Sequence, residues 1–333
     1  MKAVYIEQFG LEHLTIRETD KPQIAADEIL VEVRAFALNH LDILLIEGHY
    51  NPNLSLPHVP GSDAAGTVVV VGEKVVDFQV GDEVVTHFFI DWQSGSFRRE
   101  YFDHRYGSEG QGVFAQYIAV SPRGVVKKPD HLTFAEAATL PIAGLTAWCS
   151  VIEEVRLLPG QNIVILGTGG VSVFAIQMAQ LIGLNVAVVA GSEKAISQTQ
   201  ALGISHVFNY RTHPHWEERL LAVMPNGADL VLDVVGDIER SMKVLAVGGI
   251  VKVVGFVGTS ISPFNVFEAL MNHANVIAST PGSRESFHNL LLALHTHSLR
   301  PVIDRMFAFD QTREALAYLK QGGHFGKVVV SVS

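Results

Sequence analysis

Ser62 and Asp63 are adjacent residues whose types could do chemistry, in the stretch PHVPGSDAAG at residues 57–66. A hydroxyl beside a carboxylate is compatible with a catalytic pair, with the remains of a metal site, or with ordinary turn structure. The stretch consists largely of small residues and leads directly into the apolar run TVVVVG. Which of these three possibilities holds depends on the residues that contact Ser62 and Asp63 in the folded protein.

A second group of residues has the spacing of a dinucleotide-binding loop. In ILGTGGVSVFAIQMAQ, Gly167 and Gly169 follow a strand-like run and open a helix-like run. Without side chains, the backbone can approach a pyrophosphate, and the amides at the helix N-terminus can hold it. Ser172 replaces the third glycine of the G-x-G-x-x-G pattern, so a plain tight turn is the alternative for this stretch taken alone.

The residues after the next strand indicate which dinucleotide to expect. An NAD site usually has Asp or Glu about 20 residues beyond the first glycine, bound to the ribose hydroxyls. Here the strand ends at Ala190 and Gly191, followed by Ser192, Glu193 and Lys194. A carboxylate would repel a 2'-phosphate, so its absence from the strand end favours NADP, with Ser192 and Lys194 as phosphate ligands.

Tyr210 and Arg211 follow the third strand of this region and are expected to lie near the same phosphate. The alternative is that Ser192 caps a helix while Glu193 and Lys194 are solvated residues of its first turn. Glu193 could also restore an NAD site.

These residues need a parallel sheet to position them. Strand-like runs at 205–210, 228–236, 248–258 and 275–280 are separated by helix-like runs at 215–224 and 237–248. Such alternation predicts a doubly wound α/β sheet, with six parallel strands, over residues 126–281. Residues 1–125 contain short strands punctuated by glycine and proline, which predicts a β-rich domain that residues 282–333 complete.

The composition excludes several classes of protein. The net charge is -10 at pH 7 with 24 Lys and Arg, which argues against a nucleic-acid or anionic-membrane surface. A small-molecule substrate is therefore expected. One cysteine, Cys149, predicts a reducing, cytoplasmic location, and no signal peptide is apparent. The uncharged stretch 157–192 is broken by glycines and indicates buried strands rather than a membrane span.

Four segments together resemble the medium-chain dehydrogenase/reductase superfamily, and within it the zinc-lacking quinone oxidoreductase-like branch. They are PHVPGSDAAGTVVVVGEKVVDFQVGDEVV, HLTFAEAATLPIAGLTAW, ILGTGGVSVF and HFGKVVV. The resemblance covers nearly the whole chain. It implies a GroES-like catalytic domain, made from both chain ends, around a Rossmann domain.

The resemblance also implies that the zinc sites of the related alcohol dehydrogenases are lost. The three catalytic-zinc positions of that family correspond to Asn39, Ser62 and Ile142, and Asp63 stands where the family motif has glutamate. Tetrahedral zinc prefers thiolate, imidazole or carboxylate, so only Asp63 could serve. The lobe at residues 88–112, which carries structural zinc in those enzymes, contains no cysteine. We therefore expect no metal.

The same resemblance places Asn39 against the nicotinamide and Tyr50 near the substrate mouth. Either could donate a hydrogen bond to the carbonyl group that receives charge, and His49 is the neighbouring alternative. Otherwise, Asn39 and Asp42 organise a helix N-terminus, and His49 and Tyr50 form an exposed turn. Two residues differ from those that transfer protons in related enzymes. Leu44 stands where some family members have tyrosine, and Leu41 replaces the hydroxyl residue of the alcohol dehydrogenase proton relay.

By resemblance, the expected cofactor contacts come from the nicotinamide side, the glycine loop, the strand ends and the segment that returns to the first domain. An apolar core position is the alternative for Phe256. The expected contacts are Asn39, Thr146, Gly167, Thr168, Gly169, Gly170, Val171, Ser192, Lys194, Tyr210, Arg211, Val235, Gly236, Gly255, Phe256, Val257, Ser283, Arg284, Phe325 and Lys327.

The sequence thus predicts an NADPH-dependent, zinc-independent oxidoreductase that transfers hydride to a quinone or an α,β-unsaturated carbonyl compound. By resemblance it is a homodimer in which the strand NVIAST (275–280) pairs with its mate. Three alternatives stay open. The first is an alcohol or aldehyde oxidoreductase that works without zinc or with metal recruited through Asp63. The second is a non-catalytic NADPH-binding sensor or structural protein. The third is a module that binds a macromolecule through residues 88–112.

Overall fold

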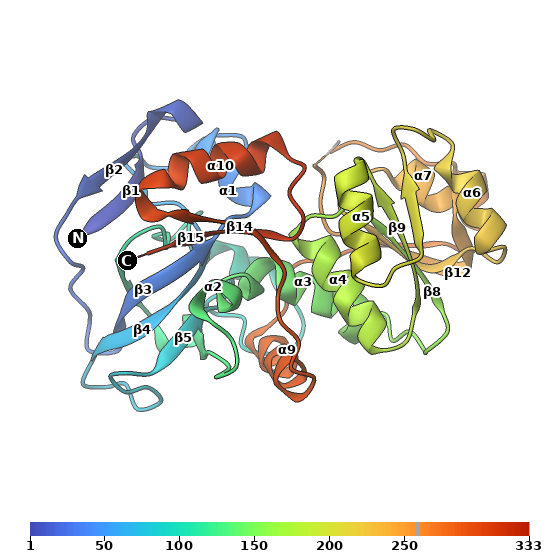
Figure 1. Ribbon diagram of the computed structural model, residues 1–333. Helices are drawn as coiled ribbons and strands as arrows, with labels where there is room; N and C mark the ends of the chain where they lie inside the picture. Colours follow the sequence, from blue (N-terminus) through green and yellow to red (C-terminus); the bar gives the residue numbers. More distant parts are fainter. Residues whose placement is uncertain (258–259, 333) are drawn as a thin grey trace. The chain divides into compact units, whose positions relative to one another are not determined.

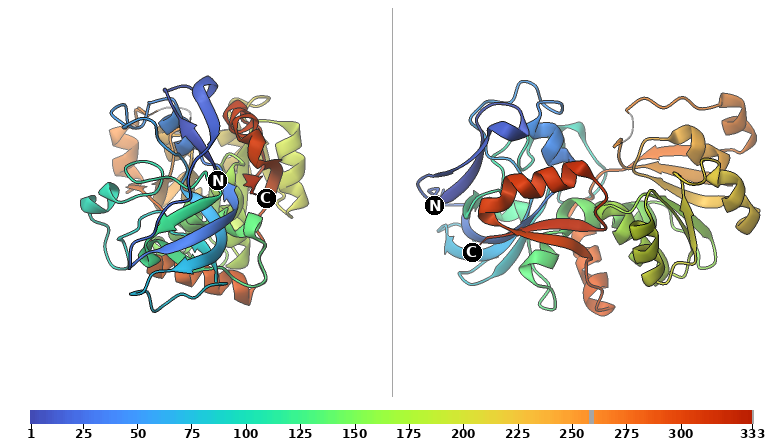
Figure 2. Two further views of the ribbon diagram at one scale, coloured as in Figure 1. Left: turned by 90° about the vertical axis from the view of Figure 1, so that its left-hand side faces the viewer. Right: turned by 45° about the horizontal axis from the view of Figure 1, so that its top comes forward.

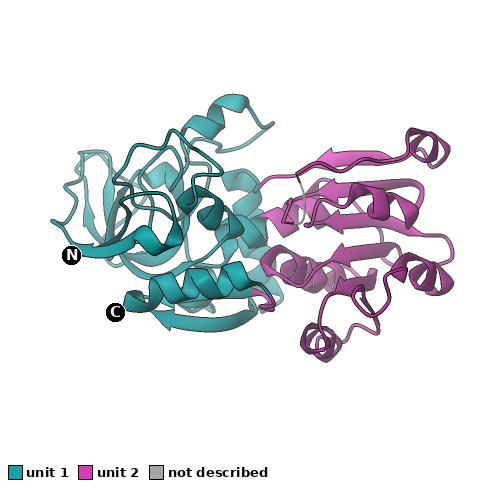
Figure 3. Ribbon diagram, turned by 90° about the horizontal axis from the view of Figure 1, so that it is seen from above, with its two compact units in different colours: residues 1–145, 281–322, 327–333 teal, residues 146–280, 323–326 magenta. Residues whose placement is uncertain are grey.

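A computed structural model describes residues 1–257 and 260–332. The chain forms two compact units (Figure 3). The first consists of Met1–Leu145, Pro281–Gly322 and Lys327–Ser333, and the second of Thr146–Thr280 and Gly323–Gly326. The last residue of the predicted strand 248–258 and the terminal residue 333 lie outside the described residues.

The first unit is built on a seven-stranded sheet with the order β14-β15-β3-β4-β5-β7, in which β6 pairs with β3. Strands β1 and β2 form a separate two-stranded antiparallel sheet. The strands are β1 (Lys2–Ile6), β2 (Leu14–Glu18), β3 (Ile29–Ala37), β4 (Asp63–Val71), β5 (Glu83–Thr86), β6 (Tyr117–Val120), β7 (Val125–Lys127), β14 (Ile303–Ala308) and β15 (Lys327–Ser331).

Strand register in this sheet brings distant polar residues together. The first residue of β4, Asp63, is opposite Ala37 at the end of β3, and β15 pairs with the same end of β3. The close β3–β4 approach depends on Gly66, where an added Cβ would lie 2.2 Å from the Glu32 carbonyl oxygen. Asp63, Asn39 and Lys327 therefore all lie at the ends of adjacent strands.

The helices of the first unit cover this sheet and connect its strands. Helix α10 contacts β14, β15 and α1, and Figure 2 shows it running alongside the C-terminal strands. Buried valine, isoleucine and phenylalanine side chains, such as Phe36 and Phe114, form the core between these elements. The helices are α1 (His40–Ile46), α2 (Phe134–Ala137), α9 (Arg284–Thr296) and α10 (Thr312–Gln321).

The second unit is a parallel six-stranded sheet with the order β10-β9-β8-β11-β12-β13. Its strands are β8 (Asn162–Leu166), β9 (Asn185–Ala190), β10 (His206–Asn209), β11 (Ala228–Asp233), β12 (Leu245–Val253) and β13 (Asn275–Ala278). Its helices are α4 (Gly170–Leu181), α5 (Glu193–Ala201), α6 (Trp216–Val223), α7 (Ile238–Lys243) and α8 (Val266–Met271), and α3 (Leu145–Trp148) begins at the unit boundary.

The strand order reverses between β8 and β11, which makes this the topological switch point of a doubly wound sheet. Right-handed crossovers put α4 and α5 on one face and α6 and α7 on the other. Figure 1 shows α4 beside α5, and α6 beside α7 away from that pair. The predicted α/β fold, a β-rich unit plus a six-stranded parallel sheet, is confirmed.

Two predicted limits differ from the structure. Residues 126–145, expected in the second domain, belong to the first unit, because β7 pairs with β5 and α2 contacts β3 and β4. Residues 323–326, expected in the first, belong to the second unit, since the Gly326 amide donates to the Thr168 carbonyl oxygen. Contacts that are distant in sequence set both limits.

The uncharged stretch 157–192 forms β8, α4, β9 and their connections. Within the part of the chain that the structure describes, no helix has the length and apolar character needed to cross a bilayer.

Candidate active site

The glycine loop connects β8 to α4 at the switch point. Gly167 has φ +85°, a left-handed conformation that side chains disfavour, and Gly169 is the N-cap of α4. An added Cβ at Gly169 would have only the His324 ring at 3.6 Å near it. The loop therefore presents open backbone and the N-terminus of a 12-residue helix, which fits a pyrophosphate group.

Ser172 occupies the position of the third glycine of the G-x-G-x-x-G pattern. Its side chain is fully buried, and its hydroxyl donates to the carbonyl oxygen of Leu166, the last residue of β8, at 3.1 Å. The serine therefore joins the helix to the strand end. Thr168, Gly170 and Val171 complete this turn, which the Gly326 amide contacts through the Thr168 carbonyl.

The predicted phosphate ligands lie at the ends of the neighbouring strands β9 and β10. The ring of Tyr210 covers Gly191 so closely that an added Cβ there would lie 2.6 Å from the phenol oxygen. The guanidinium group of Arg211 lies 5.8 Å from the centre of that ring. Ser192 and Lys194 begin α5 beside them. The structure thus gathers these four residues in one region of the second unit.

Ser192 also has the capping role considered as the alternative. Its hydroxyl oxygen accepts from the Ala195 amide at 3.2 Å, which leaves its own hydrogen available to a ligand. Glu193 accepts a hydrogen bond from the Asn209 side chain at 2.8 Å. The carboxylate that could restore an NAD site is therefore tied to β10.

Asp233 is a site-forming residue that the sequence did not single out. It is fully buried at the end of β11, and its Oδ1 accepts from the amides of Val235 and Gly236 at 2.9 and 2.8 Å. These bonds fix the loop after the strand. A carboxylate at the end of an apolar strand, before a Val-Gly turn, was the available signal.

The loop after β12 approaches the same strand end. An added Cβ at Gly255 would lie 2.7 Å from the Val234 carbonyl oxygen, so this glycine permits close passage. Phe256 and Val257 are 50% and 59% exposed. The core position considered for Phe256 is wrong, because half of this residue is exposed.

In the first unit, Ser62 and Asp63 have different partners. The Ser62 hydroxyl donates to the Tyr106 carbonyl oxygen at 3.0 Å, whereas Asp63 lies 3.7 Å from the Lys327 ammonium group. Both side chains are buried. They do not form a catalytic pair with each other.

Lys327 lies at the centre of a buried polar cluster formed with Asn39, Asp42 and Asp63. Its Nζ donates to the Leu38 carbonyl oxygen at 2.8 Å and to Asn39 Oδ1 at 2.7 Å. Asp42 accepts from the Asn39 amide at 2.7 Å, so the predicted organisation of the α1 N-terminus is observed. Lys327, predicted as a cofactor contact, directs its buried ammonium group at protein acceptors.

Burial shifts the ionisation of the whole cluster. Burial raises the pKa of Asp42 to about 7, and it raises the pKa of Asp63 to about 6 against the opposing charge of Lys327. Burial also lowers the pKa of Lys327, which the two carboxylates oppose. Two acids and one base in a dry interior favour net neutrality, so we expect the two carboxyl groups to share one proton near neutral pH.

Tyr50 is not the exposed turn residue considered as an alternative. Its hydroxyl accepts a hydrogen bond from Arg105, whose guanidinium group is buried and makes a bidentate pair with Glu109. Arg105 and Glu109 belong to the 88–112 segment, which therefore holds Tyr50. His49 is exposed and lies 4.0 Å from Glu47.

The remaining predicted contacts are distributed over both units. Thr146 is buried at the start of the second unit, and Phe325 is buried in its C-terminal segment. In the first unit, Ser283 caps α9 by accepting from the Ser286 amide, and Arg284 donates to the Val125 carbonyl oxygen at 3.2 Å. These bonds fix the start of α9.

The positions that correspond to zinc ligands do not fit a zinc ion. Asn39 and Ser62 offer only neutral oxygen atoms, which are hydrogen-bonded to Lys327 and to the Tyr106 carbonyl group. Ile142 is apolar and packs, with Leu41, against an aromatic cluster of Phe88, Phe89 and Trp92. Among the described residues, no group of three or more His, Cys, Asp or Glu side chains is placed to hold a metal ion. The donor set is therefore that of an organic hydrogen-bond network.

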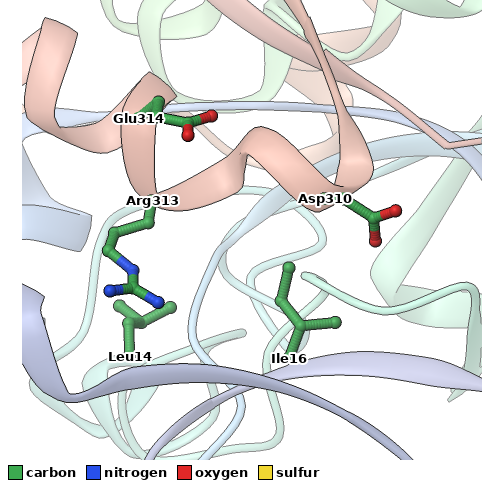
Figure 4. Close-up of a pocket in the computed structure, with 5 residues that line it drawn as sticks. All are labelled: Leu14, Ile16, Asp310, Arg313 and Glu314. Carbon is green, nitrogen blue, oxygen red and sulfur yellow. The ribbon is translucent and has the colours of Figure 1, made fainter.

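Two pockets lie apart from these residues. One, of about 290 Å³, is lined by Leu14, Ile16, Asp310, Arg313 and Glu314, and Figure 4 shows Arg313 extending toward Leu14. The other, of about 640 Å³, lies in the second unit near the starts of β8, β9 and β10. None of the predicted site residues lines either pocket, so neither identifies the site.

Known families and proteins match both units. The family described as alcohol dehydrogenase GroES-like domain matches residues 25–130, and that described as zinc-binding dehydrogenase matches residues 170–296. A zinc-type alcohol dehydrogenase-like protein of Schizosaccharomyces pombe is 35% identical over 99% of this chain and 98% of its own length. The 2-methylene-furan-3-one reductase of Solanum lycopersicum is 33% identical over 93% of this chain and 73% of its own.

A solved structure described as an NAD-dependent alcohol dehydrogenase superposes with a TM-score of 0.90 and 31% identity, over 100% of both chains. The fold, the glycine loop and the matched relatives all indicate the same family. The chain belongs to the medium-chain dehydrogenase/reductase superfamily, a nucleotide-binding family, and is an oxidoreductase.

Proposed function

We propose that this enzyme uses NADPH, without zinc, to transfer hydride to an α,β-unsaturated carbonyl compound or a quinone. The observation that carries the proposal is the Asn39 amide. Its Oδ1 accepts a hydrogen bond from the Lys327 ammonium group. Its buried Nδ2 has no partner in hydrogen-bond geometry among the described residues, although it lies close enough to Asp63 to lower the pKa of that carboxyl group. This leaves an N–H donor for an acceptor oxygen on the substrate or for the nicotinamide.

Such a donor suits an already electrophilic acceptor. When bound, NADPH would supply the hydride for the β-carbon of an enone, and the π electrons would move onto the carbonyl oxygen. The Asn39 N–H would stabilise that developing oxyanion. A proton then completes the saturated ketone, or the hydroquinone when the acceptor is a quinone. Tyr50 and, as the exposed neighbour, His49 are the candidate proton donors.

Zinc independence is proposed from the chemistry of the donor set. Alcohol oxidation benefits from a metal that stabilises an alkoxide, and Asn39, Ser62 and Ile142 supply no ligand suited to that metal. Recruitment of metal through Asp63 would require breaking its pairing with Lys327 in a fully buried place. Alcohol or aldehyde chemistry, as in the NAD-dependent relative, is the second candidate.

Preference for NADPH is proposed from Ser192, Lys194, Tyr210 and Arg211. A hydroxyl group and two cationic side chains near an aromatic ring suit a 2'-phosphate. Glu193, which is bound to Asn209, opposes this preference by its charge. Direct comparison of the two cofactors decides the matter.

The first experiment is to follow nicotinamide absorbance from NADPH and NADH with chelator-treated protein and a panel of enones, quinones and aldehydes. Turnover of enones or quinones with NADPH supports the proposal. Turnover of alcohols or aldehydes that depends on added zinc overturns it. Bound cofactor with no turnover across the panel favours the sensor or structural role.

We also propose a homodimer formed through β13, the edge strand of the parallel sheet. Val276 and Ile277 on this strand are 41% and 40% exposed, and Phe267, Leu270 and Met271 on nearby α8 are more exposed still. An apolar edge strand is a template for pairing. Sedimentation should give a dimer, and Ile277→Lys should give a monomer; a monomeric native protein contradicts the proposal.

A further inference from the structure

We infer that Lys327 is the residue that sets the orientation of the Asn39 amide, so that the enzyme offers its substrate a hydrogen-bond donor rather than an acceptor. This inference rests on the donor role proposed for Asn39. Lys327 itself does not touch the substrate and is a positioning residue.

The argument begins with the chemistry of the two groups. An ammonium group has three hydrogens and no acceptor, whereas a carboxamide has an acceptor end and a donor end of nearly equal size. Lys327 Nζ lies 2.7 Å from one end of Asn39. Only the carbonyl end can make a favourable contact there, so the NH₂ end must face away. The cation removes the twofold ambiguity of the amide.

Lys327 is itself held in one position. Its Nζ also donates to the Leu38 carbonyl oxygen at 2.8 Å and lies 3.7 Å from Asp63. Its strand, β15, pairs with β3, and the Leu38 amide donates to the Val328 carbonyl oxygen at 3.0 Å. Backbone and side chain of the lysine are therefore fixed relative to the turn that carries Asn39.

The main chain of Asn39 is fixed from the other side. Asp42 accepts from its backbone amide, which leaves the side-chain torsions as its main freedom. A cation at the amide oxygen also polarises the group and makes its N–H bonds stronger donors. Position and donor strength thus depend on the same lysine.

Other ionisable groups of the cluster do not replace it. Asp42 and Asp63 accept hydrogen bonds or pair with Lys327, and the Asn39 side chain lowers the pKa of Asp63. The NH₂ end of Asn39 thus already lies toward Asp63 while Lys327 is at Oδ1. Without Lys327, no cation would hold Oδ1, and the amide could turn about its side-chain torsions.

The test compares Lys327→Met with Lys128→Met, a matched control in the same unit. Lys128 is also buried, donates to the carbonyl oxygens of Pro129 and Leu132, and pairs with Glu83, but it makes no contact with Asn39. With an acceptor that the native enzyme reduces, kcat should fall about 10- to 100-fold in Lys327→Met. KM should change by less than about threefold, and Lys128→Met should retain kcat within about threefold.

A double-mutant cycle with Asn39→Ala separates positioning from a general structural effect. If Lys327 acts through Asn39, adding Lys327→Met to Asn39→Ala causes no further loss of kcat. An undiminished further loss overturns the inference. Asn39→Asp should keep the contact with Lys327 yet lose the donor, and therefore lose activity while remaining folded.

Lys327→Met leaves buried carboxylates without a cation, so Lys327→Met/Asp63→Asn is the second variant. It restores the charge balance, and the loss of kcat should persist in it. If this folded double variant recovers native kcat, orientation by Lys327 is contradicted.

A turnover-free measurement keeps the inference distinct from the proposed function. The Asn39 side-chain NH₂ signal, identified in amide NMR spectra by its loss in Asn39→Asp, should shift in Lys327→Met and stay unchanged in Lys128→Met. An unchanged signal in Lys327→Met overturns the inference even where enones and quinones are reduced. A shifted signal in a protein that reduces no acceptor supports the inference and contradicts the proposed function.

Discussion

The two regions that hold the predicted site residues, one in each unit, are built on opposite principles. In the second unit, the loop from Gly167 to Gly170 offers backbone, because three of its four residues are glycines, and the space beside Gly169 is largely open within the unit. In the first unit, Asn39, Asp42, Asp63 and Lys327 fill a buried region with charged and amide groups whose hydrogen bonds depend on one another.

This difference predicts how each part tolerates change. A backbone loop that binds a ligand at its surface can lose the ligand while the fold is unaffected. A buried ionic cluster cannot lose one member without leaving an uncompensated charge inside the protein. Function and stability should therefore separate in the loop and change together in the cluster.

The largest expected effect is on stability in Lys327→Met, which should lose about 3–5 kcal/mol because buried carboxylates are left unpaired. Urea unfolding at pH 8 measures it. The control is Lys252→Met in the second unit: Lys252 is as deeply buried, but its partner Glu154 is 40% exposed and can be solvated. Equal losses in the two variants would contradict the comparison.

The second effect is a pH dependence of stability. The pKa values of Asp42 and Asp63 are raised on folding to about 7 and about 6, so between about pH 4 and 7 the folded state binds more protons than the unfolded state. Stability should therefore fall as the pH rises through this window. Asp42→Asn should reduce the dependence of the unfolding free energy on pH, whereas Asp310→Asn, at an exposed carboxylate, should leave it unchanged. The same pH dependence in Asp42→Asn and the native protein would refute the assignment of this effect to Asp42.

Gly169→Ala should separate binding from folding. The added Cβ has room within the unit, and φ is -77°, so stability should change by less than about 1 kcal/mol. Affinity for NADPH, measured by fluorescence titration, should fall about 10- to 100-fold because the methyl group meets the pyrophosphate. In contrast, Gly167→Ala should cost about 1–2 kcal/mol of stability through its left-handed backbone. Unchanged NADPH affinity in Gly169→Ala would remove the loop from the cofactor site.

Lys194→Ala should reduce the ratio of kcat/KM for NADPH to that for NADH about tenfold, through loss of one charge pair with the phosphate. Steady-state assays with both cofactors measure this ratio. Lys243→Ala, at a lysine that pairs with Glu239 on α7, is the control. An unchanged ratio in Lys194→Ala contradicts the phosphate assignment.

The smallest expected effect is that of Tyr50→Phe. Loss of the hydrogen bond from Arg105 should cost about 1 kcal/mol or less of stability, and kcat should fall about twofold to tenfold if the hydroxyl helps deliver the proton. Thermal unfolding and steady-state rates measure the two. Full activity would exclude this hydroxyl from the mechanism.

The sequence alone determined the alternation of strands and helices, the glycine loop and the poor fit of Asn39, Ser62 and Ile142 to zinc. These features are readable because they depend on residues that are near in sequence or on the residue type itself. The same local signals left Ser192 with two roles, and the structure shows its capping bond.

Only the tertiary structure decided the partners of the polar residues. Lys327 lies 288 positions from Asn39, and no periodicity marks it as a buried neighbour of that amide rather than a cofactor ligand. Ser62 and Asp63 likewise look like one pair but have separate partners, because Tyr106 and Lys327 approach them from distant segments. Burial and strand register, which arise only when the sheet closes, gave those residues their charge states and their roles.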